Sequence, residues 1–311
     1  MPAVETIAAP QVSAPAWRLP HGVCDAHSHV FGPFDRFPPR EASVYALPDA
    51  PPELHATMRK TLGGEFGVLT QPAPYGHDPA AMVAALRASL GQLRGIAAAE
   101  PDISDETLAD WHEAGIRGLR FVEMRAPSGG RYPGSVGFEA LTKFAPRLRE
   151  LGWQAQLWAS IADHAALLSG LLRLGLPLTL DHMGCPDPAR GTADPDFLSV
   201  LDLVRSGQIW VKLAICRVSR AAPDYADARP LHEALLAAAP DHLVWGSDWP
   251  HVRLAPAPDA GRLLGFFAAW TPDEALRRRI LVDNPARLYG FDIARIKDEA
   301  SESIFGKGEA G

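Results

Sequence analysis

The sequence predicts a single-domain α/β protein with the architecture of a (β/α)8 TIM barrel. Eight short apolar segments alternate with segments of helical pattern along the chain. Several of the apolar segments are almost continuous, which is typical of parallel strands that are buried on both faces. A chain of 311 residues accommodates one barrel, which commonly takes about 250 residues, with a tail at each end. An open, doubly wound sheet is the alternative, but such sheets usually have fewer strands.

The expected strands follow one another along the chain, with a helix signal in several of the intervals. They lie at residues 22–30, 66–71, 93–99, 116–122, 153–159, 176–182, 209–215 and 242–247. Ser104 is a typical N-cap for the helix after the third strand. Asp78-Pro79 and Asn284-Pro285 also mark helix starts, because proline is favoured in the first turn.

We expect the barrel at residues 21–291, a flexible arm at 1–20 and a charged tail at 292–311. The arm is rich in Ala and Pro and lacks the basic and apolar regions of a signal peptide. There is no apolar run of the roughly 18 residues that a membrane span needs. The net charge of −7 argues against nucleic-acid binding by phosphate neutralisation.

The cysteines indicate a reducing environment. Cys24, Cys185 and Cys216 are odd in number and far apart, as expected of free thiols rather than a disulfide framework. We therefore expect a cytoplasmic protein. A homo-oligomer is compatible with the sequence, which does not reveal the number of copies.

Two histidines at the end of the first expected strand are the first chemical signal. Side chains alternate between the faces of a strand, so Asp25, His27 and His29 share one face. Two imidazoles that point the same way can hold a metal ion or polarise a carbonyl group. Asp25 would either orient one of these imidazoles or touch a substrate.

Further polar and aromatic residues fall where other strands end, the edge at which barrel active sites lie. They are Gln71, Arg120, Trp158, Asp181, His182, Lys212, Arg217, Asp248 and His251. Any one of them alone is more often structural, but several imidazoles and carboxylates at one end of separate strands predict an active site. Lys212 would be buried with a carboxylate partner or contact the substrate, and His251 would support the site or be structural.

Four motifs resemble those of the amidohydrolase superfamily, of the amidohydrolase-2 type. They are Asp-x-His-x-His at 25–29, Asp-His-Met-Gly at 181–184, Gly-Ser-Asp-Trp-Pro-His at 246–251 and Asp-Asn-Pro-Ala-Arg-Leu-Tyr at 283–289. More narrowly, the chain is similar to the lactonase branch of the 2-pyrone-4,6-dicarboxylate hydrolases, over about residues 20 to 291. The resemblance implies a TIM-barrel hydrolase of aromatic-compound catabolism that opens a small anionic lactone.

The resemblance also implies a catalytic role for four residues. Asp248 matches the general base that activates water, while His27, His29 and His182 match the imidazoles that hold and polarise the scissile carbonyl. These roles agree with the chemistry, because a lactone carbonyl gains oxyanion character on attack and a nearby carboxylate can take a proton from water.

The substrate-binding set is less regular. We expect substrate contacts from Tyr45, Gln71, Arg120, Arg125, Trp158, Arg217 and His251, with the arginines on substrate carboxylates. The chain departs from the family at Cys185, where the pyrone hydrolases have arginine, and at Trp158, where they have tyrosine. Either Arg125 or Arg131 could supply the second arginine after the fourth strand. An altered carboxylate clamp predicts a different lactone.

The resemblance leaves metal dependence open. Two-metal relatives use a modified lysine on the fourth strand and a histidine on the fifth, where this chain has no lysine and offers Gln156 and Trp158. The pyrone hydrolase branch is thought to work without metal, so we expect no cofactor. The alternative is one Zn²⁺ with four ligands, namely His27, His29, His182 and Asp248.

Two other functions remain as alternatives. One is a zinc-dependent decarboxylase of an aromatic or muconate-like acid, which would release carbon dioxide rather than add water. The weaker one is a non-catalytic barrel that binds a carboxylate, although the intact set of Asp248 and three histidines disfavours it.

Overall fold

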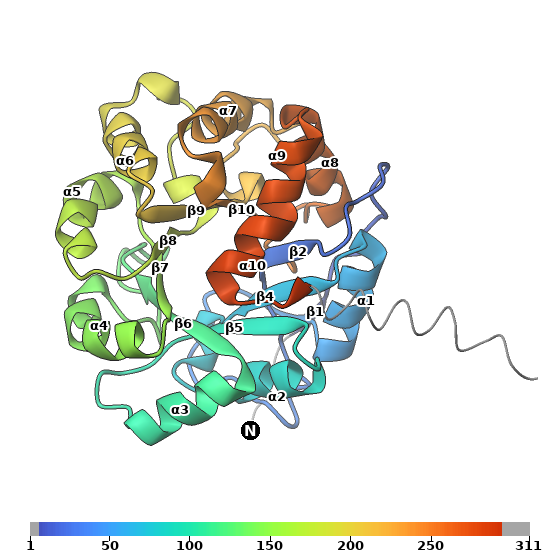
Figure 1. Ribbon diagram of the computed structural model, residues 1–311. Helices are drawn as coiled ribbons and strands as arrows, with labels where there is room; N and C mark the ends of the chain where they lie inside the picture. Colours follow the sequence, from blue (N-terminus) through green and yellow to red (C-terminus); the bar gives the residue numbers. More distant parts are fainter. Residues whose placement is uncertain (1–5, 294–311) are drawn as a thin grey trace, which may run out of the picture.

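The computed structural model describes residues 6–293 and shows a barrel of eight parallel strands surrounded by helices (Figure 1). The strands are β2 (Cys24–Ser28), β4 (Phe66–Thr70), β5 (Leu93–Ala97), β6 (Ile116–Val122), β7 (Gln154–Trp158), β8 (Leu178–Leu180), β9 (Ile209–Leu213) and β10 (Leu243–Trp245). Each strand lies within its expected range, and the prediction of a TIM barrel is confirmed.

The first and last strands meet through residues at their carboxyl ends. The backbone N–H of Asp248 donates to the carbonyl of His27 at 2.8 Å, and that of His29 donates to the carbonyl of Trp249 at 2.9 Å. The two ends of the sheet are therefore joined at the position of the predicted histidine pair.

Helices cover the outside of the barrel (Figure 1). They are α1 (Pro52–Leu62), α2 (Ala80–Ala88), α3 (Asp105–Ala114), α4 (Leu141–Glu150), α5 (Ile161–Leu172), α6 (Pro195–Arg205), α7 (Arg229–Ala238) and α8 (Ala260–Trp270). Ser104 caps α3 as predicted, its hydroxyl accepting the N–H of Thr107 at 3.1 Å. No helix among the described residues is long and apolar enough to cross a membrane.

The last helices close the amino end of the barrel. They are α9 (Glu274–Arg278), a π-helical turn (Arg279–Asp283) and α10 (Asn284–Tyr289), which crosses the barrel in Figure 1. The amide of Asn284 donates to the carbonyl of Leu243 at 2.7 Å, and Arg94 donates to the carbonyl of Tyr289 at 3.2 Å. Because Leu243 and Arg94 stand at the starts of β10 and β5, this end is filled and the opposite end is free for a site.

Part of the amino-terminal segment, which is expected to be a flexible arm at residues 1–20, bonds to later parts of the chain. Its strand β1 (Thr6–Ala8) pairs in parallel with β3 (Leu47–Asp49). The indole of Trp249 donates to the carbonyl of Pro10 at 3.2 Å, and the N–H of Ser13 donates to Asp259 at 3.0 Å. Residues 6–13 thus have hydrogen-bond partners in later parts of the chain. Residues 1–5, and 294–311 of the expected tail, lie outside the described residues.

Candidate active site

The loop after β10 holds Asp248 in a conformation fixed by several partners. Its φ is 62°, in the left-handed region that residues with a side chain rarely adopt. Asp25 accepts hydrogen bonds from the N–H of Ser247 at 2.9 Å and from its hydroxyl at 2.5 Å. The Ser247 hydroxyl also accepts the N–H of Trp249 at 3.0 Å. Such strain persists only where the surroundings enforce it, and it is common at functional sites.

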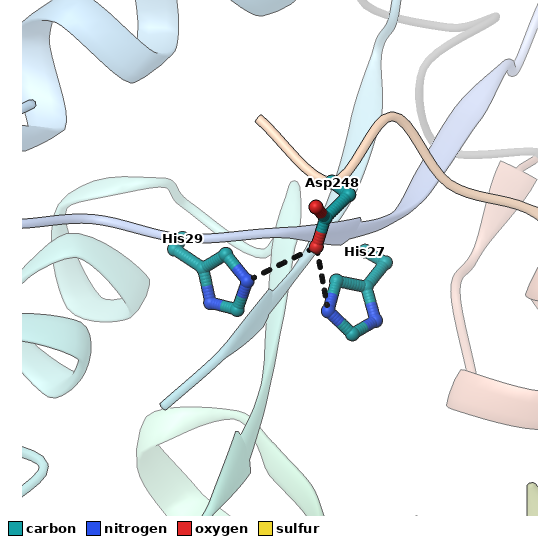
Figure 2. Close-up of side chains that lie close together, drawn as sticks. All are labelled: His27, His29 and Asp248. Carbon is teal, nitrogen blue, oxygen red and sulfur yellow. Dashed lines mark ion pairs between the residues drawn. The ribbon is translucent and has the colours of Figure 1, made fainter. Parts of the chain in front are cut away.

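The two histidines of the first motif point at one oxygen of this carboxylate (Figure 2). The Nε2 atoms of His27 and His29 each lie 3.5 Å from Oδ1 of Asp248. His29 donates from Nδ1 to the carbonyl of Thr70 at 2.7 Å, since a carbonyl can only accept. This bond orients the ring and leaves its Nε2 for the site.

His182 completes the group of imidazoles. It lies in a short 3-10 helix (His182–Gly184) directly after β8, with a φ of 50°. Its ring centroid is 5.1 Å from that of His27, and the edge of Trp158 lies against it at 6.0 Å. Burial lowers the pKa of His182 to about 4, so the ring is neutral at neutral pH.

A network of buried charges supports His27 from the other side. The ammonium of Lys212 lies 3.1 Å from Nδ1 of His27, 2.5 Å from Oε1 of Gln156 and 3.6 Å from Oδ1 of Asp181. Lys212 is fully buried, and burial lowers its pKa to about 8. The first of its two expected roles, a buried lysine with a carboxylate partner, is the observed one.

Both predicted carboxylate-binding arginines already have an acidic partner. Arg120 donates from Nε and Nη2 to Oδ2 of Asp181 at 3.2 and 3.0 Å. Arg217 donates from Nε to Asp248 and from Nη1 to the carbonyl of Val252 at 2.7 Å. A guanidinium has five N–H groups, so each arginine keeps donors for a ligand.

These cations set the charge state of the two carboxylates. Burial alone would raise the pKa of Asp248, but Arg217 and the neighbouring imidazoles together hold it well below the usual range. Burial opposes ionisation of Asp181 too, and His27, Arg120 and Lys212 outweigh it. Both residues are therefore carboxylates at neutral pH.

A small cavity of about 60 Å³ opens above this group. Its lining is His29, Phe31, Tyr45, Pro72, Ala73, Arg120, Tyr132, Trp158, His182, Arg217, Asp248, Val252 and Arg253. Most of the predicted site residues thus come together at the carboxyl ends of the strands, where the sequence placed them.

Four predicted residues are not part of this lining. His27 is fully buried behind it, with Nε2 3.5 Å from Oδ1 of Asp248. The amide of Gln71 is occupied by backbone partners, donating to Gly76 at 2.7 Å and accepting from Ala98 at 3.0 Å, so it holds loops together. Arg125 is exposed and outside the cavity lining. His251 is buried beside Asp248, behind the lining.

Asp25 and Arg131 also have roles that the sequence did not specify. The carboxylate of Asp25 accepts the backbone N–H of His27 at 3.2 Å and the two Ser247 donors, so it bonds to neither imidazole. Arg131 donates to Glu139 at 2.6 Å and is not in the lining. Tyr132 and Arg253 do line the cavity and were not predicted, because neither belongs to a recognised motif.

The buried donors can hold a divalent metal ion. One ligand atom from each of His27, His29 and Asp248 lies within 4.8 Å of the other two. Nitrogen and oxygen donors suit zinc, and the bond from His29 to the Thr70 carbonyl is typical of a metal-ligating histidine. His182 groups with His27 and Asp181 instead, so the four expected ligands do not form a single set.

Comparison with known proteins agrees with the barrel and its motifs. The amidohydrolase family model matches residues 24–291. The 4-sulfomuconolactone hydrolase of Hydrogenophaga intermedia is 36% identical over 277 residues, 88% of this chain and 90% of that protein. The 2-pyrone-4,6-dicarboxylate hydrolase of Comamonas testosteroni is 34% identical over 288 residues, 89% of this chain and 93% of that protein.

Solved structures extend the likeness to the fold. The crystal structure of a Pseudomonas putida protein, provisionally named 2-pyrone-4,6-dicarboxylic acid hydrolase, superposes with a TM-score of 0.77 at 33% identity. The match covers 88% of this chain and 99% of that one. The chain therefore belongs to the amidohydrolase family.

Proposed function

We propose that this protein is a hydrolase that opens an anionic lactone. The observation that carries the proposal is the convergence of His27 and His29 on one oxygen of Asp248, next to a cavity that Asp248, Arg120 and Arg217 line. The two curated relatives above are named as hydrolases of a sulfonated lactone and of a dicarboxylated pyrone, which supports the same reaction here.

The reaction needs a base, a nucleophile and a contact for the carbonyl oxygen. The ionised Asp248 accepts a proton from a water molecule, whose oxygen then adds to the lactone carbonyl. The Nε2–H assigned to His27 stabilises the oxyanion that forms. The ring C–O bond then breaks, and the leaving oxygen takes the proton from Asp248. The product is a ring-opened acid.

We further propose that the side chains perform this reaction without a resident metal. Nδ1 of His27 lies 3.1 Å from the Lys212 ammonium and 3.2 Å from Oδ1 of Asp181. We assign Lys212 as the donor to Nδ1, which places the ring hydrogen on Nε2. An Nε2–H beside Asp248 can donate to a carbonyl oxygen that binds there, whereas it cannot be a metal ligand. If a zinc ion were bound by His27, His29 and Asp248, it would supply Lewis-acid polarisation of the carbonyl.

A panel of lactones tests both the proposed hydrolysis and its independence of metal. It contains 2-pyrone-4,6-dicarboxylate, a carboxylated muconolactone and the neutral δ-valerolactone, each assayed by acid release and product mass before and after exhaustive chelation. We expect the anionic lactones to gain one water molecule and most activity to survive chelation. Loss of carbon dioxide would support the decarboxylase instead. Activity that disappears on chelation and returns with one equivalent of zinc would overturn the metal-free mechanism.

We also propose a cytoplasmic location. Cys24, Cys185 and Cys216 are all free thiols, as expected in a reducing compartment. Cell fractionation checks this, and recovery of the protein from an oxidising compartment would contradict it.

A further inference from the structure

We propose that Arg253 is a specificity-determining residue that binds a second anionic group of the substrate at the mouth of the cavity. This inference rests on the proposed hydrolysis of an anionic lactone and names the residue that selects a doubly charged one. Arg253 lies in the loop after β10, five positions beyond Asp248.

The conformation of Arg253 is stabilised by contacts with its neighbours. Its φ is 67°, in the region that an arginine rarely adopts without enforcement. Its Nη1 donates to the hydroxyl of Tyr132, and its guanidinium carbon lies 5.6 Å from the centroid of the Tyr132 ring. Tyr132 itself is only 4% exposed, so it is a fixed support.

Tyr132 belongs to a wall in which cations and aromatic rings alternate. Its ring centroid lies 5.1 Å from that of Trp158, and the guanidinium of Arg120 lies 4.9 Å from the Trp158 ring. All four residues line the cavity. Cation–π contacts of this kind orient a guanidinium without neutralising its charge.

Arg253 is the arginine of the cavity lining whose charge is not neutralised. Arg120 pairs with Asp181 and Arg217 pairs with Asp248. Within the described residues 6–293, no carboxylate lies within ion-pair distance of Arg253, and its side chain is exposed at the cavity. Of its five N–H groups one is used by Tyr132, so the rest of the fork can bind a carboxylate or sulfonate.

Neither arginine expected after the fourth barrel strand is available for this role. Arg125, one candidate after the fourth barrel strand, is exposed and lies outside the cavity lining. Arg131, the other candidate after the fourth barrel strand, pairs with Glu139 and Glu123. Among the described residues, the arginine that can bind a second anionic group therefore comes from the loop after β10 and not from the loop after β6.

Binding of non-hydrolysable probes tests the inference without relying on turnover. Benzene-1,3-dicarboxylate and benzoate are titrated calorimetrically into the wild type, Arg253→Met, Arg253→Lys and the matched control Arg125→Met. We expect Arg253→Met to weaken binding of the dicarboxylate by about tenfold or more and binding of benzoate by less than about twofold. The reason is that the paired hydrogen bonds of the guanidinium are lost at one anionic group only. Arg253→Lys keeps the positive charge but loses the paired guanidinium donors, so its affinity for the dicarboxylate should fall by an intermediate amount. Arg125→Met should match the wild type.

The role of Arg253 would be overturned if Arg253→Met weakened binding of both probes equally or of neither. It would also be overturned if the wild type bound both probes with equal affinity. Tyr132→Phe is a second variant, expected to weaken the dicarboxylate selectively but less, because only the hydroxyl partner of Arg253 is lost. The lactone panel separates the two proposals. If Arg253→Met selectively loses dicarboxylate binding but the wild type hydrolyses no lactone, the anion-binding role of Arg253 stands and the proposed hydrolase activity is rejected.

Discussion

The bond from His29 to the carbonyl of Thr70 shows how single contacts set the chemistry of this site. Because a carbonyl only accepts, Nδ1 of His29 carries the hydrogen and Nε2 is presented to Asp248. At His27 the proposed donor is Lys212, and this assignment puts the hydrogen on Nε2 instead. Two adjacent imidazoles of similar placement therefore offer opposite groups, one an acceptor and the other a donor.

Asp248→Asn should nearly abolish hydrolysis while the fold persists. Asparagine keeps the shape and the hydrogen bond from Arg217 but cannot take a proton from water, and loss of a general base costs about 10²–10⁴ in rate. The measurement is kcat on the best lactone of the panel, with circular dichroism as the check on folding. A correctly folded variant within a few-fold of the wild type would reject Asp248 as the base.

Lys212→Met should lower kcat by about tenfold to a hundredfold with little change in KM, because a support of this kind acts on catalysis through the group it orients. Methionine fills a similar volume but cannot donate to His27 or Gln156. The nitrogen chemical shifts of His27 should show hydrogen moving to Nδ1, which Asp181 faces at 3.2 Å. The matched control is Lys60→Met on the exposed side of α1. An unchanged tautomer in the Lys212 variant would contradict the positioning role.

The sequence predicted the motif residues and missed their partners for a physical reason. His27, His29, His182 and Asp248 are recognisable because neighbouring residues form short motifs at strand ends. The acid partner of Arg120 is 61 residues away, and Tyr132 is 121 residues from Arg253. Such pairs are created by closure of the barrel, so no local pattern reveals them.

At the scale of elements, strand alternation predicted the face of β2 but not what each side chain there would bond. His27 and His29 do turn to Asp248 (Figure 2). Asp25 bonds to Ser247 and so connects β2 to the segment after β10. The pairing of β2 with β4 also shifts register between Asp25 and Ser28, an irregularity that simple alternation does not predict.

Asp25→Asn should change the pH dependence of stability. Burial raises the pKa of Asp25 from 3.8 to about 6, so the folded state binds this proton more tightly than the unfolded chain. The resulting stabilisation is present below about pH 4 and is lost as the pH rises through 6, by up to about 3 kcal/mol. Asparagine is neutral throughout and has no such loss.

The check is urea unfolding of both proteins at several values between pH 4 and pH 7. The free energy of unfolding of the wild type should fall relative to the variant across this range. The exposed Asp49→Asn serves as the matched control and should follow the wild type. A constant difference between the wild type and Asp25→Asn would show that the charge on Asp25 is not penalised by burial.

At the scale of the whole molecule, the two ends of the barrel have separate tasks. The amino end is filled by α10 and by the buried ring of Tyr289, which packs with Phe66 and Val68. The carboxyl end holds the cavity and the loop with Asp248. The sequence predicted this division from the barrel alone. It could not place the amino-terminal segment, because a strand of three exposed residues has no apolar pattern to reveal it.

That segment should matter for activity as well as for stability. Deletion of residues 2–13 removes the pairing of β1 with β3, the bond between Trp249 and Pro10, and the bond from Ser13 to Asp259. Trp249 directly follows Asp248, so the loop that carries the base loses an anchor.

We expect Tm to fall by about 2–4 °C, since each kcal/mol shifts Tm by about 2–4 °C in domains of 150–250 residues and by less in a longer chain. We also expect kcat to fall at temperatures where the variant is fully folded. Trp249→Phe is the narrower control, because it removes the indole N–H and keeps an aromatic ring. Unchanged kcat in the folded deletion variant would show that the segment stabilises the barrel without positioning Asp248.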